Sequence, residues 1–259
     1  MITPILTHIE ALEDMKKYPK ELYAIGNQAL LGRPKVSIVG TRRPSSYTKE
    51  FTYTLAQELS KRGVVIVSGG AMGVDATAHH AGKPDNSIAV VANSLDIRYP
   101  VINKNLIEAI ERRGLVLSQF PATFKATPWS FVVRNELVVA LGDILIVTEA
   151  DERSGSMRSV EFALKMGKDI YVLPQQLNES RGTNRLLEEG LAKPIYNIET
   201  FADKYGVKPT VENIEKDDFF YFCQTSPTFD LAIEKFGSKV YEAELEGIIK
   251  VENGLVRLL

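Results

Sequence analysis

The chain has 259 residues, with 31 Lys and Arg against 33 Asp and Glu and a formal net charge of −2. With 25% charged and 44% apolar residues it has the composition of an ordinary globular protein, and no stretch reaches the roughly 20 consecutive apolar residues that a membrane span needs. The near-neutral charge excludes a protein that coats nucleic acid through bulk positive potential. Any nucleic-acid site therefore has to be local.

The chain contains a single cysteine, Cys223, which excludes an intrachain disulfide framework and a cysteine-rich zinc site. No metal-ligand motif such as H-E-x-x-H is present, so neither a metal nor another cofactor is expected. The first 22 residues carry acids among their apolar residues and lack the uninterrupted apolar core of a secretory signal. We expect a cytoplasmic protein.

Residues 1–35 predict a short helical segment that docks on the main domain, with one helix over Ile5–Lys17 and a weaker one reaching Leu31. From residue 36 onward short apolar runs alternate with helical stretches. The runs predict strands at Val36–Val39, Val64–Val67, Ser87–Ala92, Leu115–Leu117, Ile144–Thr148 and Asp169–Leu173. The stretches between them predict helices at Lys49–Lys61, Asp75–Ala81, Lys104–Arg113, Val132–Leu141 and Ser156–Met166.

These apolar runs are continuous rather than alternating, which is typical of parallel strands covered by helices on both faces. The β-α alternation predicts an α/β fold with a Rossmann-like, doubly wound, mostly parallel sheet over residues 36–205. A polar stretch with Gly and Pro at 206–216 predicts a linker. Residues 217–259 then predict three helices and a short terminal strand, a pattern that suits a small winged-helix-like domain.

Ligands of open α/β sheets bind beyond the carboxyl ends of the strands, where three loops of this chain are rich in Gly and Ser. They cover residues 40–46, with Arg42 and Arg43, residues 68–75, and residues 149–156. Each opens a helix whose free N–H groups can hold an anion, and arginine forks suit phosphate. Tight packing is an equal alternative for the second loop, which contains no cation, and a solvated surface pair is the alternative for the two arginines.

Arg134 lies within an apolar helical stretch, where it either extends its stem to solvent or reaches a ligand. Trp129 and Phe131, just before it, are either core residues or a surface on which bases stack. For His79 a structural role is favoured, because no Cys or Ser nucleophile stands at a recognisable turn near it. The chain also lacks the G-x-x-x-x-G-K-[ST] and G-x-G-x-x-G motifs, so ATPase activity and dinucleotide binding are not supported.

Taken together, the motifs resemble the DprA/Smf family of DNA-processing proteins. The matching segments occur in the family's order and spacing, and they are VSIVGTRRPSSY at 36–47, VIVSGGAMGVDATAHHAG at 65–82, SLDIRYPVINKNL at 94–106, FVVRNELVVALGDILIVTEADERSGSMRSVEFAL at 131–164 and LPQQLNESRGTNRLLEEG at 173–190. The resemblance implies an extended Rossmann fold without catalytic activity. It also implies binding of single-stranded DNA, a homodimer, and loading of the recombinase RecA onto incoming strands during natural transformation.

The resemblance also implies a set of DNA-binding residues. The family's motifs fall on Gly40, Thr41, Arg42 and adjacent Arg43, on Ser68 to Asp75 with Gly69 and Gly70, on Arg134 and Asn135, and on Ser154, Gly155 and Ser156. Phe131 is the candidate for stacking a base, and Lys104 and the weaker candidate Lys125 are basic residues for the same surface.

The chain departs from the family pattern at two places. Where many members have L-I-T-A after S-G-S, this sequence has Met157-Arg158-Ser159-Val160, which adds Arg158 as a further cation for the DNA backbone. Where members have Pro-Gly after the last strand, this chain has Pro174-Gln175, so a different shape is expected for that turn.

Charge divides the chain unevenly. Residues 206–259 hold six Lys and Arg against ten Asp and Glu, a net charge of −4, which leaves residues 1–205 at +2. The third predicted helix of this tail carries Glu242, Glu244 and Glu246, whereas a winged helix that docks on DNA normally has a basic recognition helix. We therefore expect the tail to contact protein rather than DNA.

Two functions of different class remain. The first is a non-enzymatic single-strand binder and recombination mediator. The alternative is a Rossmann-like nucleotide phosphoribohydrolase, whose P-G-G-x-G-T-x-x-E loop would correspond to residues 154–161. That stretch keeps Glu161 and one glycine but lacks the other glycines and the Thr, which argues against catalysis.

Overall fold

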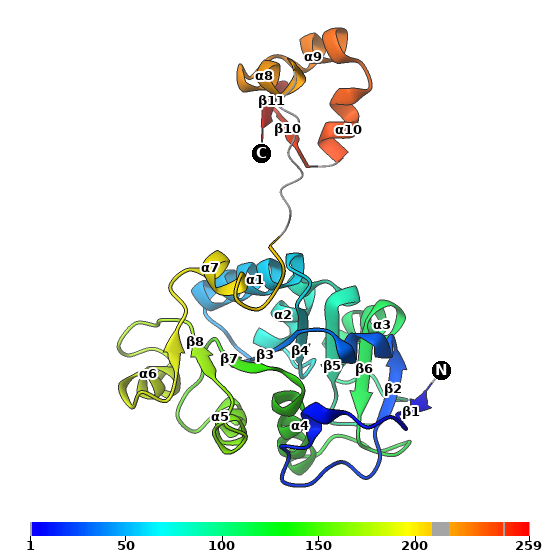
Figure 1. The fold of residues 1–259 in the computed structure, drawn as a ribbon, viewed down its shortest axis with the longest axis vertical. Coiled ribbons are helices and arrows are strands. Elements are labelled where there is room, and N and C mark those ends of the chain that lie inside the picture. Colours follow the sequence, from blue (N-terminus) through cyan, green and yellow to red (C-terminus); the bar gives the residue numbers. More distant parts are fainter. Residues whose placement is uncertain (1, 209–217, 246, 259) are drawn as a thin grey trace. The chain divides into compact units, whose positions relative to one another are not determined.

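In a computed structural model the chain forms two compact units, residues 1–208 and 209–259. The structure describes residues 2–208, 218–245 and 247–258. The first unit is built on a nine-stranded sheet in the order β1-β2-β6-β5-β4-β3-β7-β8-β9 (Figure 1). The strands are β1 Thr3–Pro4, β2 Tyr23–Gly26, β3 Lys35–Val39, β4 Val65–Ser68, β5 Ser87–Val90, β6 Leu115–Ser118, β7 Ile144–Val147, β8 Ile170–Val172 and β9 Lys193–Pro194.

Strands β3 to β9 run parallel, and only β1 and β2 are antiparallel to their neighbours. Every residue of β3 to β8 is buried, as the continuous apolar runs predicted. From β3 the chain adds β4, β5 and β6 on one side and then returns to add β7, β8 and β9 on the other. The predicted α/β, doubly wound, mostly parallel fold is confirmed, and its switch point lies between β3 and β7.

Helices cover both faces of the sheet. They are α1 Ser46–Lys61, α2 Val74–Gly82, α3 Lys104–Arg113, α4 Pro128–Leu141, α5 Gly155–Lys165, α6 Arg181–Glu188 and α7 Ile198–Ala202, with 3₁₀ turns at η3 Pro84–Asn86 and η4 Val101–Asn103. In Figure 1, α1, α2 and α7 lie above the sheet, and α4 and α5 lie below it. Within the described residues, no helix is long and apolar enough to span a bilayer.

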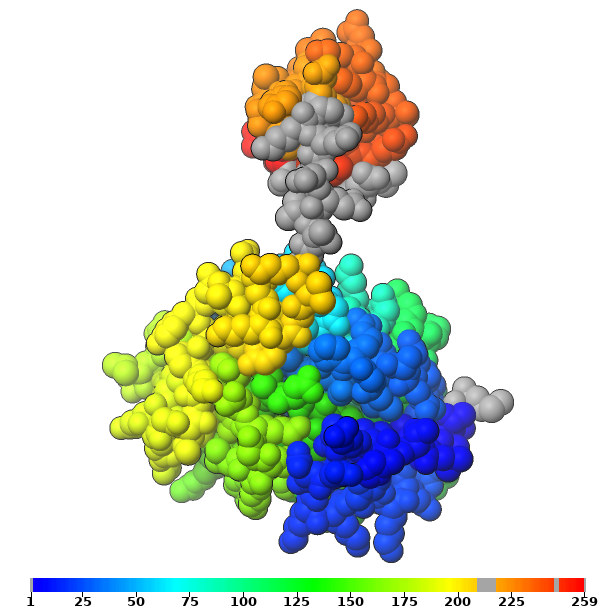
Figure 2. Space-filling view, viewed as in Figure 1, coloured from blue at the N-terminus to red at the C-terminus, as the bar shows by residue number. Residues whose placement is uncertain are grey.

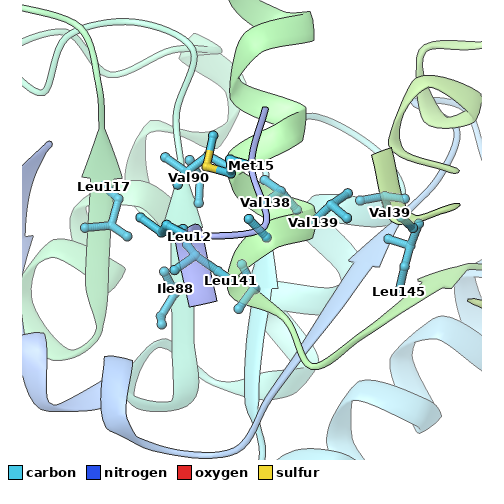
Figure 3. Close-up of a cluster of buried hydrophobic side chains, with 14 of the residues drawn as sticks. Leu12, Met15, Val39, Ile88, Val90, Leu117, Val138, Val139, Leu141 and Leu145 are labelled. Carbon is cyan, nitrogen blue, oxygen red and sulfur yellow. The ribbon is translucent and has the colours of Figure 1, made fainter. Parts of the chain in front are cut away.

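The larger apolar core lies on the α4 side of the sheet. It joins strand residues to α4, α5 and α6 and to the N-terminal segment. Figure 3 shows part of this cluster, in which Val138 and Leu141 of α4 lie near Ile88 of β5 and Leu12 of the N-terminal segment. A second cluster packs α1, α2 and α7 on the opposite face. These two cores fix the loops at the carboxyl ends of the strands from both sides.

The helices expected in residues 1–35 are wrong. The segment instead contains β1, β2 and two 3₁₀ turns, η1 Glu10–Leu12 and η2 Gln28–Gly32. Residues 23–26 pair with β6 and extend the sheet, while buried apolar side chains such as Leu12 and Met15 pack on the core. Backbone pairing to an open sheet edge and tertiary burial thus override the helical spacing of the apolar residues. In Figure 2 this segment, in dark blue, forms part of the surface of the first unit.

The second unit contains α8 Asp218–Gln224, α9 Phe229–Phe236, α10 Lys239–Leu245 and a hairpin of β10 Ile249–Glu252 and β11 Leu255–Leu258. Three helices followed by a hairpin form the predicted winged-helix-like arrangement, with β10 added to the one strand that was expected. Most of the expected linker, residues 209–216, lies outside the described residues. Residues 206–208, the start of the expected linker, belong to the first unit, because the Val207 N–H donates to the carbonyl of Arg62 and Lys208 pairs with Asp203.

Candidate functional site

A cavity of about 400 Å³ lies at the switch point of the sheet, beyond the carboxyl ends of β3 and β7. All three of the Gly- and Ser-containing loops contribute to it, together with the first turns of α4. Its lining consists of Val39, Gly40, Thr41, Arg42, Ala71, Asp75, Pro128, Phe131, Val132, Arg134, Asn135, Ser154, Gly155, Ser156 and Ser159. This is the position at which open α/β sheets bind ligands.

The loop after β3 is fixed by Glu149, at the end of β7. The Thr41 N–H donates to the Glu149 carbonyl at 2.9 Å, and the Glu149 carboxylate accepts from the Ser45 N–H at 3.0 Å. Ser45 also caps α1, with its hydroxyl accepting from the Thr48 N–H. The backbone of Arg42 is therefore held in place while its side chain remains exposed at the cavity.

The second loop provides the seat for Arg134. A Cβ at Gly69 would lie 1.2 Å from Nη1 of Arg134, so only glycine leaves room for the guanidinium. Gly73 has φ +79°, and a Cβ there would meet the Thr41 carbonyl oxygen at 2.5 Å. Tight packing, one of the two alternatives for this loop, is observed at Gly69 and Gly73. That packing also places a cation from α4 in a loop that has none of its own.

Arg134 and Asp75 form a buried pair on the floor of the cavity. Nη1 of Arg134 lies 3.7 Å from Oδ2 of Asp75, and both residues are at most 6% exposed. Burial lowers the pKa of Arg134, and Asp75 opposes that change. Burial likewise raises the pKa of Asp75, and Arg134 opposes it. Among the described residues the buried Nε of Arg134 has no hydrogen-bond partner, and the residue lines the cavity, so its guanidinium charge faces the space that an anionic ligand would fill.

The third loop leads into α5, which begins at Gly155 after the N-cap residue Ser154. Within the described residues the Ser154 hydroxyl has no hydrogen-bond partner, although it stands where a cap would be expected. Asn135 of α4 reaches across the cavity and donates to the Gly155 carbonyl at 3.4 Å. The N-terminus of α5 therefore faces the cavity with positive helix-dipole potential and unused polar groups.

An aromatic surface adjoins these cations. The guanidinium carbons of Arg42 and Arg134 lie 5.1 Å and 5.9 Å from the centroid of the Phe131 ring, and the Tyr99 ring lies 6.2 Å from it. A second, smaller cavity borders Phe131, with Gly69, Tyr99 and Met72 in its lining. Neither Tyr99 nor Met72 was predicted from the sequence as a site residue. The Tyr99-Pro100 pair, shortly before a helix that begins at Lys104, was the available signal in the sequence for Tyr99.

The structure brings most of the candidate residues together. Nine line the larger cavity, namely Gly40, Thr41, Arg42, Phe131, Arg134, Asn135, Ser154, Gly155 and Ser156, and Gly69 lines the smaller one. Gly70 lines neither, although its carbonyl accepts from the Asn103 amide at 3.0 Å. Asp75, which pairs with Arg134 and lines the larger cavity, is the main addition, because the sequence placed it only at the end of the motif at residues 68–75.

Four candidate cations do not line either cavity. Arg43 and Lys125 are exposed. Lys104, on α3, lies 3.9 Å from Glu108. Arg158 lies 3.0 Å from Glu161, one turn along α5, so its charge is neutralised locally instead of adding to the cavity.

His79 has the structural position that was favoured for it. It is fully buried, and neither ring nitrogen has a hydrogen-bond partner within the described part of the chain. Burial, with a smaller contribution from His80, lowers the pKa of His79 to about 3. The described residues contain no cluster of His, Cys, Asp and Glu that could hold a metal ion.

The Pro174-Gln175 turn has its own set of contacts. The Gln175 amide donates to the Thr48 hydroxyl at 3.0 Å and to the Thr148 carbonyl at 2.8 Å. The Tyr47 hydroxyl donates to the Pro174 carbonyl. The glutamine side chain thus links the end of β7 to α1, a role that glycine could not take.

Residues 7–206 match the family model described as DNA recombination-mediator protein A. The chain belongs to this family. The DNA processing protein DprA of Bacillus subtilis is 33% identical over 186 residues, which are 70% of this chain and 62% of that protein. DprA of Streptococcus pneumoniae is 35% identical over 183 residues, 69% of this chain and 64% of that protein. The chain thus spans less than two thirds of these two relatives.

Two solved structures of family members have the same fold as this chain. The Helicobacter pylori DNA processing protein A, studied for its single-stranded DNA binding mode, is 46% identical with a TM-score of 0.77, covering 78% of this chain and 94% of that one. DprA of Streptococcus pneumoniae is 32% identical with a TM-score of 0.73, covering 79% of this chain and 74% of that one. Membership in a family of recombination mediators supports the prediction of a binding protein rather than an enzyme.

Proposed function

We propose that the chain binds single-stranded DNA at the switch-point cavity as a recombination mediator. The observation that carries the proposal is Arg134, a buried guanidinium that lines the cavity and lies beside the half-buried Phe131 ring. Arg42 and Arg134 hold successive phosphates together with backbone N–H groups of the three loops. A base stacks on Phe131, as in proteins that bind single strands without sequence preference.

The wider role follows from the proposed ligand and the family. The chain acts as a homodimer in the cytoplasm, where it protects incoming DNA and helps load RecA during natural transformation. The comparison with the Helicobacter pylori protein supports the single-stranded ligand. The acidic second unit is assigned to a protein contact, because Glu242 and Glu244 of α10 are exposed on the helix that would otherwise recognise DNA.

The phosphoribohydrolase alternative has less support. Its catalytic carboxylate would be Glu161, which is exposed, pairs with Arg158 and does not line the cavity. The one carboxylate in the cavity lining, Asp75, already pairs with Arg134. A general acid or base has to reach the substrate, and this arrangement does not provide one. Release of free base from nucleoside monophosphates would restore this alternative.

Fluorescence anisotropy with labelled single and double strands tests the proposal. The wild-type chain should bind the single strand, with log affinity falling against log salt at roughly −0.7 per phosphate neutralised. Arg42→Ala should weaken binding about tenfold, because a charge-assisted hydrogen bond to phosphate is lost. The matched control is Arg43→Ala, an exposed neighbour that does not line the cavity, and its effect should be smaller. Binding that is insensitive to salt and to Arg42→Ala would contradict the proposal.

A further inference from the structure

A further hollow, of about 640 Å³, lies beside the start of α4 and is separate from the switch-point cavity and the smaller cavity next to it. It is formed by the N-terminal segment, the loop after β6 and the first turns of α4. Its lining consists of Met15, Lys17, Tyr18, Pro19, Lys20, Glu21, Gln119, Phe120, Pro121, Phe124, Trp129, Val133 and Glu136. We call this hollow the aromatic groove.

The aromatic groove adjoins the switch-point cavity across a single helix. On α4, Pro128, Phe131, Val132 and Asn135 line the cavity, whereas Trp129, Val133 and Glu136 line the aromatic groove. The two sets are each spaced by three or four residues and are offset by one, so they occupy adjacent faces of the helix. The first turn of α4 therefore forms a ridge between two hollows, one of which is the proposed single-strand site.

The aromatic groove presents the exposed ring of Trp129 beside two phenylalanine rings that are buried or half-buried. Phe120 and Phe124 stack with centroids 4.5 Å apart, and Trp129 packs edge-on against Phe120 at 6.0 Å. The Trp129 side chain is nevertheless 63% exposed, although burying a ring of this size is favourable. An exposed indole supported from behind by another ring is suited to stacking on a base.

Charges around the aromatic groove favour an anionic ligand. Three lysines, Lys17 and Lys20 in the lining and Lys125 next to it in sequence, stand against two carboxylates, of which Glu136 accepts from the Lys16 N–H at 2.9 Å and Glu21 accepts from the Tyr23 hydroxyl at 2.7 Å. Lys17 and Lys20 are exposed, and neither has an ion-pair partner among the described residues. Lys125, which did not fit the switch-point cavity, follows Phe124 in the loop that forms one wall.

We propose that the aromatic groove is a second single-strand subsite. A DNA strand held at Arg42 and Phe131 continues over the start of α4, where a base stacks on Trp129 and the backbone passes Lys17, Lys20 and Lys125. This inference rests on the proposed function and extends it. It assigns roles to the exposed Trp129 and to Lys125, which the cavity leaves without one.

The chain provides its own probe, because Trp129 is its only tryptophan. When an oligothymidylate of about 20 nucleotides is added to the wild-type chain, stacking of a base on the indole should quench the tryptophan emission. An oligothymidylate of about five nucleotides fills only the cavity and should leave the emission unchanged. Anisotropy, followed in parallel, reports binding of both oligonucleotides independently of the tryptophan.

Substitutions distinguish stacking from a general effect. Trp129→Ala should weaken binding of the long oligonucleotide about five- to tenfold and leave the short one within twofold, and Trp129→Phe should retain most of the affinity. Lys17→Ala combined with Lys20→Ala should reduce the salt dependence for the long oligonucleotide only. The matched control is Tyr196→Ala, which removes another exposed ring, 84% exposed, that lines neither the cavities nor the groove.

The outcomes separate this inference from the proposed function. If the long oligonucleotide binds by anisotropy but leaves the emission and the Trp129→Ala affinity unchanged, the second subsite is wrong and the cavity stands. If neither oligonucleotide binds, the proposed function itself fails, and the second subsite with it. An emission that changes with protein concentration in the absence of DNA would assign the aromatic groove to a second copy of the chain and would also overturn the inference.

Discussion

The two units of the molecule differ in whether any of their described acidic or basic side chains are buried. In the first unit a few ionisable groups, Asp75, His79 and Arg134, are buried beneath the cavity. In the second unit the charges are numerous but lie on the surface, as Asp230, Glu234, Glu242 and Glu244 do. Net charge alone would have assigned DNA binding to neither unit. The comparison shows that the position and burial of a charge matter more for function than the total.

The largest effect is expected from Arg134→Ala. It leaves Asp75 buried without its partner, and breaking a buried pair in this way typically costs about 3–5 kcal/mol in free energy of unfolding. Urea denaturation would measure the loss, and single-strand binding should disappear with it. An apolar double variant, Arg134→Met with Asp75→Leu, should recover most of the stability but not the binding. If Arg134→Ala lowered the free energy of unfolding by less than about 1 kcal/mol, the Arg134–Asp75 pair would be solvated. The contrast between buried charges in the first unit and exposed charges in the second would then be weaker.

The second prediction concerns pH and His79. Its folded pKa of about 3 lies below the ordinary value of 6.5, so the unfolded chain binds more protons between these values and stability falls as pH falls. Between pH 6.5 and 5 this amounts to about 2 kcal/mol. The pKa of Asp75 is raised, so its effect on the free energy of unfolding changes with pH in the opposite direction. Its contribution to stability is present at low pH and is lost as pH rises.

His79→Leu isolates the histidine in this experiment. The substitution removes the titrating ring, and no hydrogen bond to a described residue is lost with it. Urea midpoints measured from pH 7 to pH 5 should therefore decline less in the variant than in the wild-type chain. Equal declines would show that His79 is hydrated in solution. Glu242→Gln, an exposed change in the second unit, should leave the wild-type pH profile unchanged.

A third and smaller effect is expected at the exposed edge of the cavity. Phe131→Leu keeps an apolar side chain but removes the ring that Arg42 and Arg134 flank. Because stacking of one base is worth about 1–3 kcal/mol, affinity for a single strand should fall at least fivefold, while Phe131→Tyr should stay near wild type. Anisotropy gives both values. An equal loss in the two variants would indicate that the ring supports Arg42 sterically instead of contacting a base.

The alternation of β3 to β8 with helices was predictable because each of these strands is a buried, mostly apolar run of three to five residues. Lys104–Arg113 forms a helix with the predicted bounds. Helix α4 begins four residues before the predicted start, because Thr127 and Ser130 form a capping box around Pro128, a local signal that the apolar spacing obscured. The N-terminal strands could not be inferred, since their pairing depends on an open edge at β6.

The site was predictable as three loops but not as a packed arrangement. That Gly69 makes room for Arg134, and that Asp75 pairs with it, follows from the meeting of segments more than 50 residues apart in sequence. The ion pair between Arg158 and Glu161 was foreseeable from the sequence, because residues three apart on a helix are neighbours. Loop composition thus indicates where a ligand binds, and only packing shows which cations remain for it.

The smallest effect is expected from removing the second unit. A chain ending at residue 208 keeps the Val207 and Lys208 contacts to the first unit, so the cavity should be intact. Lys235 lies 4.6 Å from the Phe222 ring and Lys250 pairs with Glu252, so these cations are already engaged within the unit. Single-strand affinity should therefore change less than twofold when protein of equal oligomeric state is compared by anisotropy. A tenfold loss would mean that the second unit holds DNA despite its acidic surface, and burial would then no longer distinguish the two units.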